Sequence, residues 1–368
     1  MSDFSQFVPP HIRRLAESNQ SRPLKQSGSS AKPIALNLNE NPFGPSPLAL
    51  KAIEAALAEI HRYPEIQATD LHEEIAHFHR VRPDQILVTA GATELLCMIS
   101  RTLLAPGLNA ITSARSFIVY KLATQVTEGS LIEVKTRENG YDLDAIADAI
   151  NANTRIVFIA NPNNPTATLV TADEVDRFLT KIPEHVLIVL DEAYGDFAQH
   201  FAQKRSVTFS RSLDYVRQER NVIVLKTFSK AHGLAGLRVG YGIGPARLIS
   251  LFAPLRTIFS ISSLAQTAAL AALRDSEHIR KAVENNFEQA EVLTAGLTKL
   301  GFPVPPTWAN FLYCELSEDA APFAERLQAS GVTVQPLRLW GAPTAIRVSI
   351  GTSEQNQQFL DMMEKVVR

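Results

Sequence analysis

Residues 222–230 read VIVLKTFSK, and this stretch decides the fold. Its apolar start is short and rich in β-branched residues, which predicts a buried strand. Lys230 then falls in the turn past the strand's carboxyl end, where open α/β sheets bind their ligands. Thr227 and Ser229 can donate hydrogen bonds to an anion there, and Arg238 offers a permanent planar charge for a phosphate. The alternative is an ordinary exposed lysine in a polar loop, which describes most lysines.

Three further apolar runs also end beside small or polar residues. They are residues 86–88 before Gly91, residues 155–160 before Asn164, and residues 186–190 before Asp191. Because strands and helices alternate from residue 85 to residue 245, we expect an α/β fold with a mostly parallel, doubly wound sheet. The carboxyl ends of parallel strands meet at one edge of a sheet, so these residues should converge on one crevice with Lys230.

Small residues follow the first of these runs and open a predicted helix; they are Gly91, Ala92 and Thr93. Such residues leave backbone N–H groups facing open space, and the helix dipole makes that place attractive to an anion. Many α/β turns have this pattern and bind nothing. The pattern therefore gains weight only beside the hydroxyl groups and the guanidinium described above.

A pyridine aldehyde phosphate would use all of these groups. Its aldehyde needs an amine with which to form an imine, and Lys230 is placed for that. Its ring nitrogen needs a carboxylate that keeps it protonated, which we assign to Asp191. A phenol and an amide should bind the ring oxygen, and an aromatic side chain should cover the ring face. The candidates for these three tasks are Tyr194, Asn164 and Phe117.

Four motifs resemble those of fold type I pyridoxal-phosphate aminotransferases: NPNNPT at 161–166, DEAY at 191–194, TFSK at 227–230 and GLRVGY at 236–241. More narrowly, the chain is similar to the histidinol-phosphate aminotransferases. The stretches that carry this narrower resemblance are NENP at 39–42, RYP at 62–64, SLAQ at 263–266, NFL at 310–312 and RVSIG at 347–351. The resemblance covers nearly the whole chain from about residue 35.

This resemblance implies a homodimer with its active sites at the subunit interface, where Tyr63 reaches the cofactor phosphate of the neighbouring subunit. It also implies that Arg347 binds the anionic group of the substrate, and Asn41 is a further candidate for binding the substrate. Lys230 would move a proton between the substrate carbon and the cofactor carbon. The expected reaction transfers the amino group of L-histidinol phosphate to 2-oxoglutarate, with imidazole acetol phosphate and glutamate as products.

The sequence departs from that family at Gln335, where an Arg that helps to hold the substrate phosphate is usual. Glutamine has neither the charge nor the bidentate fork of arginine, although Arg338 could substitute from three residues away. Trp340 stands where a smaller aromatic is common, and its ring could stack on a substrate ring. An aromatic amino acid aminotransferase, acting on phenylalanine or tyrosine, is therefore the alternative. A decarboxylase or lyase, and a non-catalytic ligand-binding relative, also stay open.

Composition and charge argue against other classes of protein. The chain has 368 residues, 45% of them hydrophobic, and a formal net charge of −2, so neither nucleic acid nor a membrane is expected as a partner. Two distant cysteines without metal spacing, and a start without a signal peptide, favour the cytoplasm. We expect an arm at residues 1–33, a large cofactor-binding domain at 34–250 and a smaller α+β domain at 251–368.

A histidine-rich stretch, residues 72–79, invites comparison with metal sites. The zinc helix signature places two histidines four residues apart on one face, whereas His72 and His77 are five apart. We therefore expect a solvated helix face and no metal. A nucleotide site is not expected either, because the chain has no phosphate loop and the glycines at 240–244 lack the dinucleotide spacing.

Overall fold

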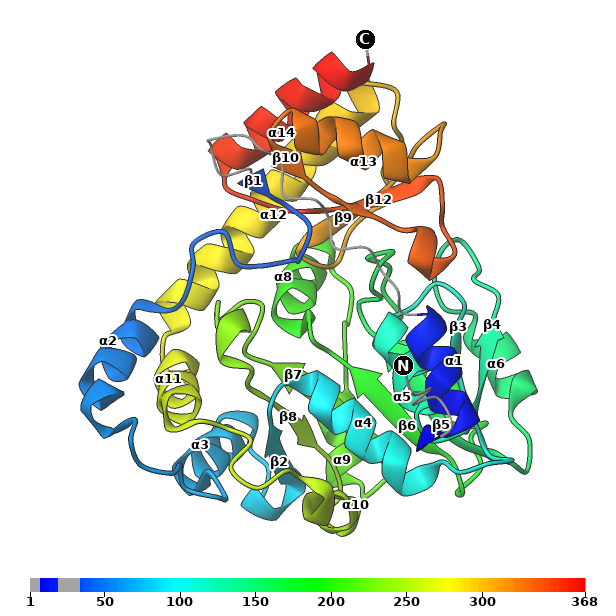
Figure 1. The fold of residues 1–368 in the computed structure, drawn as a ribbon, viewed down its shortest axis with the longest axis vertical. Coiled ribbons are helices and arrows are strands. Elements are labelled where there is room, and N and C mark those ends of the chain that lie inside the picture. Colours follow the sequence, from blue (N-terminus) through cyan, green and yellow to red (C-terminus); the bar gives the residue numbers. More distant parts are fainter. Residues whose placement is uncertain (1–6, 19–33, 368) are drawn as a thin grey trace.

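The computed structural model describes residues 7–18 and 34–367, which form a large sheet with its helices and a smaller unit at one end (Figure 1). The helices are α1 Pro10–Ser18, α2 Pro47–Ala56, α3 Thr69–His79, α4 Ala92–Leu103, α5 Ile118–Gln125, α6 Leu143–Ala149, α7 Ala172–Leu179, α8 Gly195–Arg205, α9 Ser212–Arg217, α10 Ala246–Phe252, α11 Ser263–Leu273, α12 Ser276–Lys299, α13 Ala320–Ala329 and α14 Ser353–Val367. Short 3-10 helices are η2 Leu57–Glu59, η3 Pro83–Gln85, η4 Ala235–Leu237, η5 Ala253–Leu255 and η6 Arg338–Trp340.

The large sheet has seven strands in the order β2-β8-β7-β6-β5-β3-β4. The strands are β2 Ile86–Thr89, β3 Asn109–Ser113, β4 Ser130–Val134, β5 Thr154–Ala160, β6 Leu187–Asp191, β7 Val222–Thr227 and β8 Gly240–Ile243. Neighbours are parallel except at β8, which runs antiparallel to both β2 and β7. Every residue of β2 and β6 is buried, as expected of unbroken apolar strands covered on both faces. The prediction of a mostly parallel α/β fold is confirmed.

Strand β8 was not predicted from the sequence, because glycine is depleted in strands and weakens their pattern. Its glycines serve close packing instead. A Cβ on Gly242 would lie 2.4 Å from Cδ2 of Leu95 in α4, and a Cβ on Gly240 would lie 2.9 Å from the backbone N of Ala92. The glycine-rich stretch thus lets α4 approach the sheet, which accounts for it without a dinucleotide.

The smaller unit is built on a three-stranded antiparallel sheet in the order β11-β12-β9, with bounds β9 Phe311–Glu315, β11 Gln335–Pro336 and β12 Ala345–Ser349. Beside it, β1 Ile34–Ala35 pairs in parallel with β10 Val332–Thr333. Helices α12, α13 and α14 pack around these strands (Figure 1). An early segment of the chain is thus joined to a late one.

Two hydrophobic cores show where the chain passes from one unit to the other. Ala265, Ala268 and Leu273 of α11 lie in the core of the large sheet, whereas Ile34 and Leu36 pack in the core of the smaller unit. We therefore propose that the large domain ends near residue 275 rather than at 250. Of the predicted arm, the described residues 7–18 contain α1, which lies beside α5 in Figure 1, and the rest falls outside the described residues.

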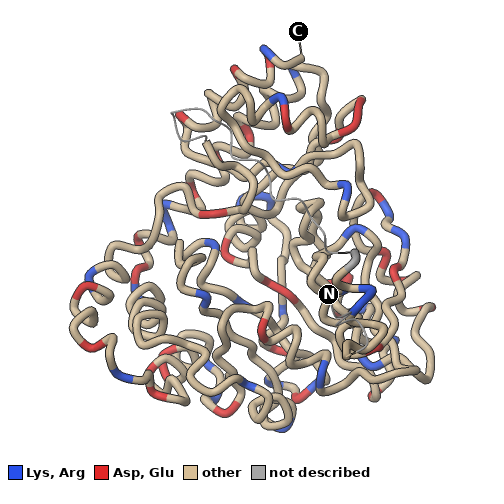
Figure 2. Tube along the Cα trace, in the orientation of Figure 1, with Lys and Arg blue, Asp and Glu red and all other residues tan. Residues whose placement is uncertain are grey.

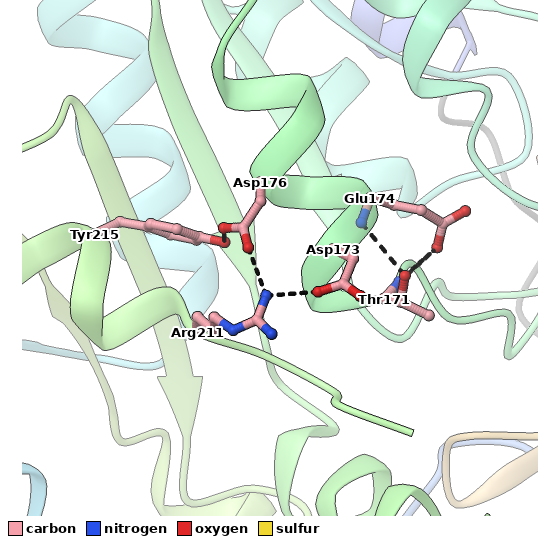
Figure 3. A network of polar contacts seen from close by, with 6 residues as sticks. All are labelled: Thr171, Asp173, Glu174, Asp176, Arg211 and Tyr215. Atoms are coloured by element: carbon pink, nitrogen blue, oxygen red, sulfur yellow. Dashed lines mark hydrogen bonds and ion pairs between the residues drawn. The ribbon is translucent and has the colours of Figure 1, made fainter. Parts of the chain in front are cut away.

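A polar network ties together the crossover that leads into β7 (Figure 3). Nη1 of Arg211, just before α9, lies 2.7 Å from Oδ1 of Asp173 and 2.5 Å from Oδ2 of Asp176, both on α7. The hydroxyl of Tyr215 donates to Asp176 at 2.5 Å, and Thr171 caps the start of α7. The network positions the connection whose end carries the reactive turn.

The histidine stretch lies on α3, and its rings are partly turned inward rather than all solvated as expected. Nε2 of His79 lies 2.8 Å from the hydroxyl of Tyr241, and burial lowers the pKa of His79 to about 3. Nδ1 of His72 lies 3.1 Å from the carbonyl oxygen of Ala68. Among the described residues, no three His, Cys, Asp or Glu side chains are grouped to hold a metal.

Charges of both signs are spread along the chain (Figure 2), which agrees with the small net charge of the sequence. Within residues 7–18 and 34–367, no helix has the length and apolar character needed to cross a membrane.

Candidate active site

A cavity of about 320 Å³ lies where the carboxyl edge of the large sheet meets the smaller unit. The large-sheet side contributes Ala92, Thr93, Phe117, Asn164, Asp191, Tyr194, Thr227, Ser229, Lys230 and Arg238. The smaller unit contributes Gln335, Trp340 and Arg347, and the segment between them contributes Leu38 and Asn39. A larger hollow of about 500 Å³ lies elsewhere, beside Glu184 and Asn221, and none of the predicted site residues lines it.

Lys230 lies in the turn after β7, and its Nζ donates a hydrogen bond to the carbonyl oxygen of Leu38 at 3.0 Å. Burial lowers the pKa of this amine to about 8; the positive charges of Arg347 and Arg238 act in the same direction, while Glu40 opposes them. More of the amine is therefore uncharged near neutral pH than in an exposed lysine. Only the uncharged amine can attack a carbonyl carbon.

Asp191 ends β6 and is almost completely buried. The hydroxyl of Tyr120 donates to its Oδ2 at 2.9 Å, and the backbone N–H of Ala193 donates to its Oδ1 at 3.2 Å. Burial raises the pKa of Asp191 to about 6, although both hydrogen bonds lower it. At neutral pH the carboxylate is therefore mostly ionised and can accept from a protonated ring nitrogen.

An anion-binding cup forms where α4 begins beside the end of β7. Helix α4 has no side-chain cap, so its first N–H groups are available to an anion. Nη1 of Arg238 lies 3.4 Å from the hydroxyl of Ser229, which accepts from Thr227 at 2.9 Å. Gly91 does not line the cavity itself. A Cβ there would lie 2.6 Å from Nη2 of Arg238, so its glycine leaves room for the guanidinium.

Three groups surround the place where a ring would lie. The buried hydroxyl of Tyr194 accepts hydrogen bonds from Nδ2 of Asn39 at 3.0 Å and from Nδ2 of Asn164 at 3.3 Å. Phe117 contributes an aromatic face at the end of the loop before α5. A phenol, an amide and an aromatic side chain are thus brought to one cavity.

Arg347 reaches the cavity from β12. Its Nη1 donates to Oδ1 of Asn164 at 2.6 Å and its Nη2 donates to the carbonyl oxygen of Asn37 at 2.7 Å, while its buried Nε has no partner. Nε1 of Trp340 is likewise buried without a partner. Gln335 lies opposite Arg347 on β11. Two unsatisfied N–H donors beside one cavity suit a substrate with an anionic or strongly accepting group.

Besides Gly91, three predicted site residues do not line this cavity. Tyr63 is exposed and stacks on Phe259, with ring centroids 4.6 Å apart. The amide of Asn41 instead donates to the carbonyl oxygen of Ala231 at 2.8 Å. Arg338 points outward and pairs with Asp319, so the structure does not support its use as a replacement for a guanidinium at position 335.

Three contributors to the site were not predicted from the sequence. Asn39 and the carbonyl group of Leu38 lie beside Tyr194 and Lys230, although the motif at 39–42 had pointed to this segment. Tyr120, whose hydroxyl meets Asp191, is the third contributor. Its spacing of three residues from Phe117 placed both on one helix face, but no pattern shows which carboxylate its hydroxyl meets.

The donor set fits pyridoxal 5′-phosphate. Lys230 supplies an amine with a lowered pKa, and Asp191 supplies a buried carboxylate for the ring nitrogen. The uncapped start of α4 and the space beside Gly91 form a cradle that a phosphate with Arg238 would fill.

Comparison with known proteins agrees with this chemistry. The family Aminotransferase class I and II matches residues 31–363. The chain is 39% identical to histidinol-phosphate aminotransferase 2 of Pseudomonas aeruginosa over 372 residues, which cover 100% of this chain and 99% of the relative. It is 38% identical to histidinol-phosphate aminotransferase of Akkermansia muciniphila over 370 residues, covering 98% and 99% of the two chains.

A solved structure is also similar to this chain. It is the histidinol-phosphate aminotransferase of Sinorhizobium meliloti in complex with pyridoxal-5′-phosphate, with a TM-score of 0.88 and 25% identity over 100% of this chain and 99% of that one. The family match, the full-length relatives and the fit of the cavity agree. The chain therefore belongs to the class I and II aminotransferases, and it is an enzyme that depends on pyridoxal 5′-phosphate.

Proposed function

We propose that this enzyme transfers the amino group of L-histidinol phosphate to 2-oxoglutarate, giving imidazole acetol phosphate and glutamate, a step of histidine biosynthesis. The observation that carries this proposal is the similarity along the whole chain to relatives that are named histidinol-phosphate aminotransferases. The cavity supports it, because it offers an arginine with an unpartnered N–H to an anionic substrate.

The side chains of the cavity divide the work of such a transfer. When bound, the cofactor supplies a ring that accepts the electrons released at the substrate carbon. Nζ of Lys230 would take a proton from that carbon and deliver it to the cofactor carbon, since its pKa of about 8 suits a proton carrier near neutral pH. Asp191 would hold the ring nitrogen charged. Tyr194 and Asn164 would orient the ring oxygen, and Phe117 would cover the ring.

The remaining residues would bind anions. We propose that the cofactor phosphate occupies the cup of Ala92, Thr93, Thr227, Ser229 and Arg238. Arg347 would bind the phosphate of the amino donor and, in the second half of the reaction, a carboxylate of 2-oxoglutarate. Its fork matches both groups. One cation would thus serve two substrates in turn.

An aromatic amino acid aminotransferase is the second candidate, and the side chain of Gln335 favours it. Gln335 lines the cavity but carries no charge, and its amide donates to the carbonyl oxygen of Pro336 at 3.0 Å. Among the described residues of the smaller unit, Arg347 is the only cation that lines the cavity. Trp340 adds an aromatic surface there. The cation of Arg347 and the ring of Trp340 suit phenylalanine or tyrosine, because each of these amino acids has one carboxylate and one aromatic ring.

A comparison of amino donors with 2-oxoglutarate tests the proposal, with glutamate formation as the measurement. We expect kcat/KM for histidinol phosphate to exceed that for phenylalanine and tyrosine by at least about tenfold, because a phosphate offers Arg347 more negative charge and one more acceptor oxygen than the carboxylate of an amino acid does. The reverse order would establish the second candidate.

The variant Gln335→Arg sharpens the test. If histidinol phosphate is the substrate, an added guanidinium should raise its kcat/KM, because it gives the phosphate a second bidentate partner. Gln335→Met is the matched control, since it is similar in size and uncharged. No gain with Arg, together with efficient turnover of phenylalanine, would favour the aromatic substrates.

We also propose that the enzyme is a homodimer in which Tyr63 reaches the cofactor phosphate of the partner subunit. An apolar surface supports this proposal: Leu50, Leu57 and Ile60 are exposed on one segment beside Tyr63. A cytoplasmic location is proposed as well, because free thiols such as Cys97 and Cys314 suit a reducing compartment.

A further inference from the structure

We propose that Tyr120 is a positioning residue: its hydroxyl group holds the carboxylate of Asp191 in the one orientation that serves the cofactor's ring nitrogen. The inference rests on the role proposed above for Asp191. Tyr120 does not line the cavity, so it acts only through the side chain that it holds.

The contact itself is well defined. The hydroxyl of Tyr120 lies 2.9 Å from Oδ2 of Asp191, and both side chains are buried. An ionised carboxylate can only accept, so Tyr120 is the donor. The backbone N–H of Ala193 binds the other oxygen, Oδ1, at 3.2 Å. One donor on each oxygen fixes the plane of the carboxylate and leaves further lone pairs for a third partner.

Tyr120 is itself held rigidly. Its ring is fully buried and stacks on Phe158 of β5, with centroids 4.7 Å apart and an interplanar angle of 4°. Its edge meets Phe117 at 5.7 Å and 87°. Such aromatic contacts define one position for the ring, so the hydroxyl cannot swing away from Asp191 without breaking them.

Helix α5 therefore contributes to the ring site twice. Phe117 precedes its first residue and lies in the cavity, whereas Tyr120 lies one turn further on and behind the carboxylate. The face and the nitrogen of a bound ring would both be governed by the placement of this helix. A side chain used only to fill the core would need neither the hydroxyl group nor its alignment with Asp191.

The charges around Asp191 make this donor important. Glu192, its neighbour, disfavours a second negative charge, and no ion pair of Asp191 is found among the described residues. Burial raises the pKa of Tyr120, Tyr141 and Tyr194, so all three phenols stay uncharged near neutral pH. Tyr120 is therefore a permanent donor, and its loss would raise the pKa of Asp191 further.

The variant Tyr120→Phe tests the proposal, because it keeps the stacked ring and removes the hydroxyl alone. The full-length protein, freed of cofactor, is titrated with pyridoxal 5′-phosphate and with its 1-deaza analogue, in which carbon replaces the ring nitrogen. We expect the variant to lose about tenfold in affinity for pyridoxal 5′-phosphate, the scale of a hydrogen bond to a charged group, and about nothing for the analogue. The preference, defined as the ratio of the affinity for pyridoxal 5′-phosphate to that for the 1-deaza analogue, should therefore be smaller in the variant than in the unaltered protein.

The chain offers a matched control in Tyr241→Phe. Tyr241 is also a buried tyrosine with a bonded hydroxyl, but its partner is His79, away from the cavity. This variant should keep the preference of the unaltered protein. Should Tyr120→Phe not fold, Phe158→Leu keeps the hydroxyl and loosens the ring, and it should lower the same preference in part.

A pH series adds a readout that simple packing would not change. The preference should disappear as the pH falls and Asp191 takes up a proton. Because the missing donor raises the pKa of Asp191, the midpoint should lie at higher pH in Tyr120→Phe than in the unaltered protein.

The outcomes are separable. Equal losses for both ligands, or an unchanged preference and midpoint in Tyr120→Phe, would overturn the role of Tyr120 and leave that of Asp191 intact. If the unaltered protein itself showed no preference, and Asp191→Asn changed nothing, the proposed role of Asp191 would fail first.

Discussion

At the scale of single residues, burial shifts the pKa values of an acid and a base of the site toward neutral pH. Desolvation lowers the pKa of Lys230 to about 8 and raises the pKa of Asp191 to about 6. The pKa values of a base and an acid thus approach each other. Perturbed groups that share a cavity are typical of catalytic sites. These two lie on the turn after β7 and at the end of β6, which are neighbouring strands.

The shifted pKa of Lys230 predicts how the cofactor-free protein takes up pyridoxal 5′-phosphate. The amine is uncharged above its pKa, so the uptake rate should rise with pH, with a midpoint near 8. Arg347→Met removes a positive charge that lowers this pKa, and the midpoint should move to higher pH. Stopped-flow absorbance measures the rate, and Arg347→Lys, which keeps the charge, is the control. A midpoint that stays in place in Arg347→Met would contradict the assigned cause.

Gly91 gives a second prediction at this scale. Gly91→Ala should weaken binding of pyridoxal 5′-phosphate by tenfold or more, because the new Cβ would displace the guanidinium of Arg238. It should also cost roughly 1–2 kcal/mol of stability, since its φ of +81° disfavours a side chain. Equilibrium titration and thermal unfolding measure the two effects.

Gly107→Ala is the matched control for that experiment. Gly107 has a φ of +86°, but a Cβ there would meet nothing within 4 Å. This variant should lose stability in the same way and keep its affinity for the cofactor. If both variants bound equally well, Gly91 would matter only for its backbone.

Residues of this site differed in how well the sequence could predict them. Those directly after buried strands, such as Lys230 and Asp191, were predictable, because strand ends can be located from local patterns. Asn41 and Arg338 were expected to face the substrate, yet each has a partner elsewhere, at Ala231 and Asp319. The choice between neighbouring polar residues depends on contacts that are remote in sequence, and a local pattern contains no information about them.

At the scale of elements, α4 connects the sheet with the site. Its first turn offers N–H groups to an anion, and its next turn packs through Leu95 against the missing side chain of Gly242 on β8. The distance between α4 and the sheet is therefore set by Gly242, which has no side chain. The position of the phosphate cup therefore depends on strand packing.

Gly242→Ala tests this dependence. The added methyl group would lie 2.4 Å from Cδ2 of Leu95, so we expect a loss of about 1–3 kcal/mol in stability, the usual cost of overpacking. Combining it with Leu95→Ala should cost less than the sum of the two single changes. Chemical denaturation of the four proteins measures the cycle, and strict additivity would refute the contact.

Elements were predicted unevenly for the same physical reason. The apolar, β-branched sequences of β2, β5, β6 and β7 predicted these strands. Strand β8 was not predicted, because close packing requires glycine at positions where a strand former is usual. The boundary that we propose near residue 275 also depends on packing, because the small residues of α11 fit the core of the large sheet. Cooperation between distant elements, rather than local preference, decides both cases.

At the scale of the whole molecule, the active site lies at the junction of two units, and the large unit also carries an exposed apolar surface. Ile60 is 61% exposed and lies near Tyr63, which is 82% exposed. A surface of this kind is expected to be covered by another protein molecule. The proposed dimer would cover it with a second copy.

Ile60→Arg should therefore shift the mass in solution from twice the 40.5 kDa chain toward one chain, because it places a charge in the proposed interface. Analytical ultracentrifugation measures the mass. Leu339→Arg is the matched control, since Leu339 is 68% exposed but lies in the smaller unit. A dimer that persists in Ile60→Arg and dissociates in Leu339→Arg would place the interface elsewhere.

The short segment after β1 has a mechanical consequence. The segment begins in the smaller unit. The carbonyl oxygen of Asn37 accepts a hydrogen bond from Arg347, and that of the next residue, Leu38, accepts one from Lys230. Only Leu36 separates the last residue of β1 from Asn37, which makes the first of these contacts. The same short segment therefore connects the smaller unit with the reactive amine. A displacement of the smaller unit relative to the large sheet would shift the carbonyl oxygen of Leu38 and so change the hydrogen bond that restrains Lys230.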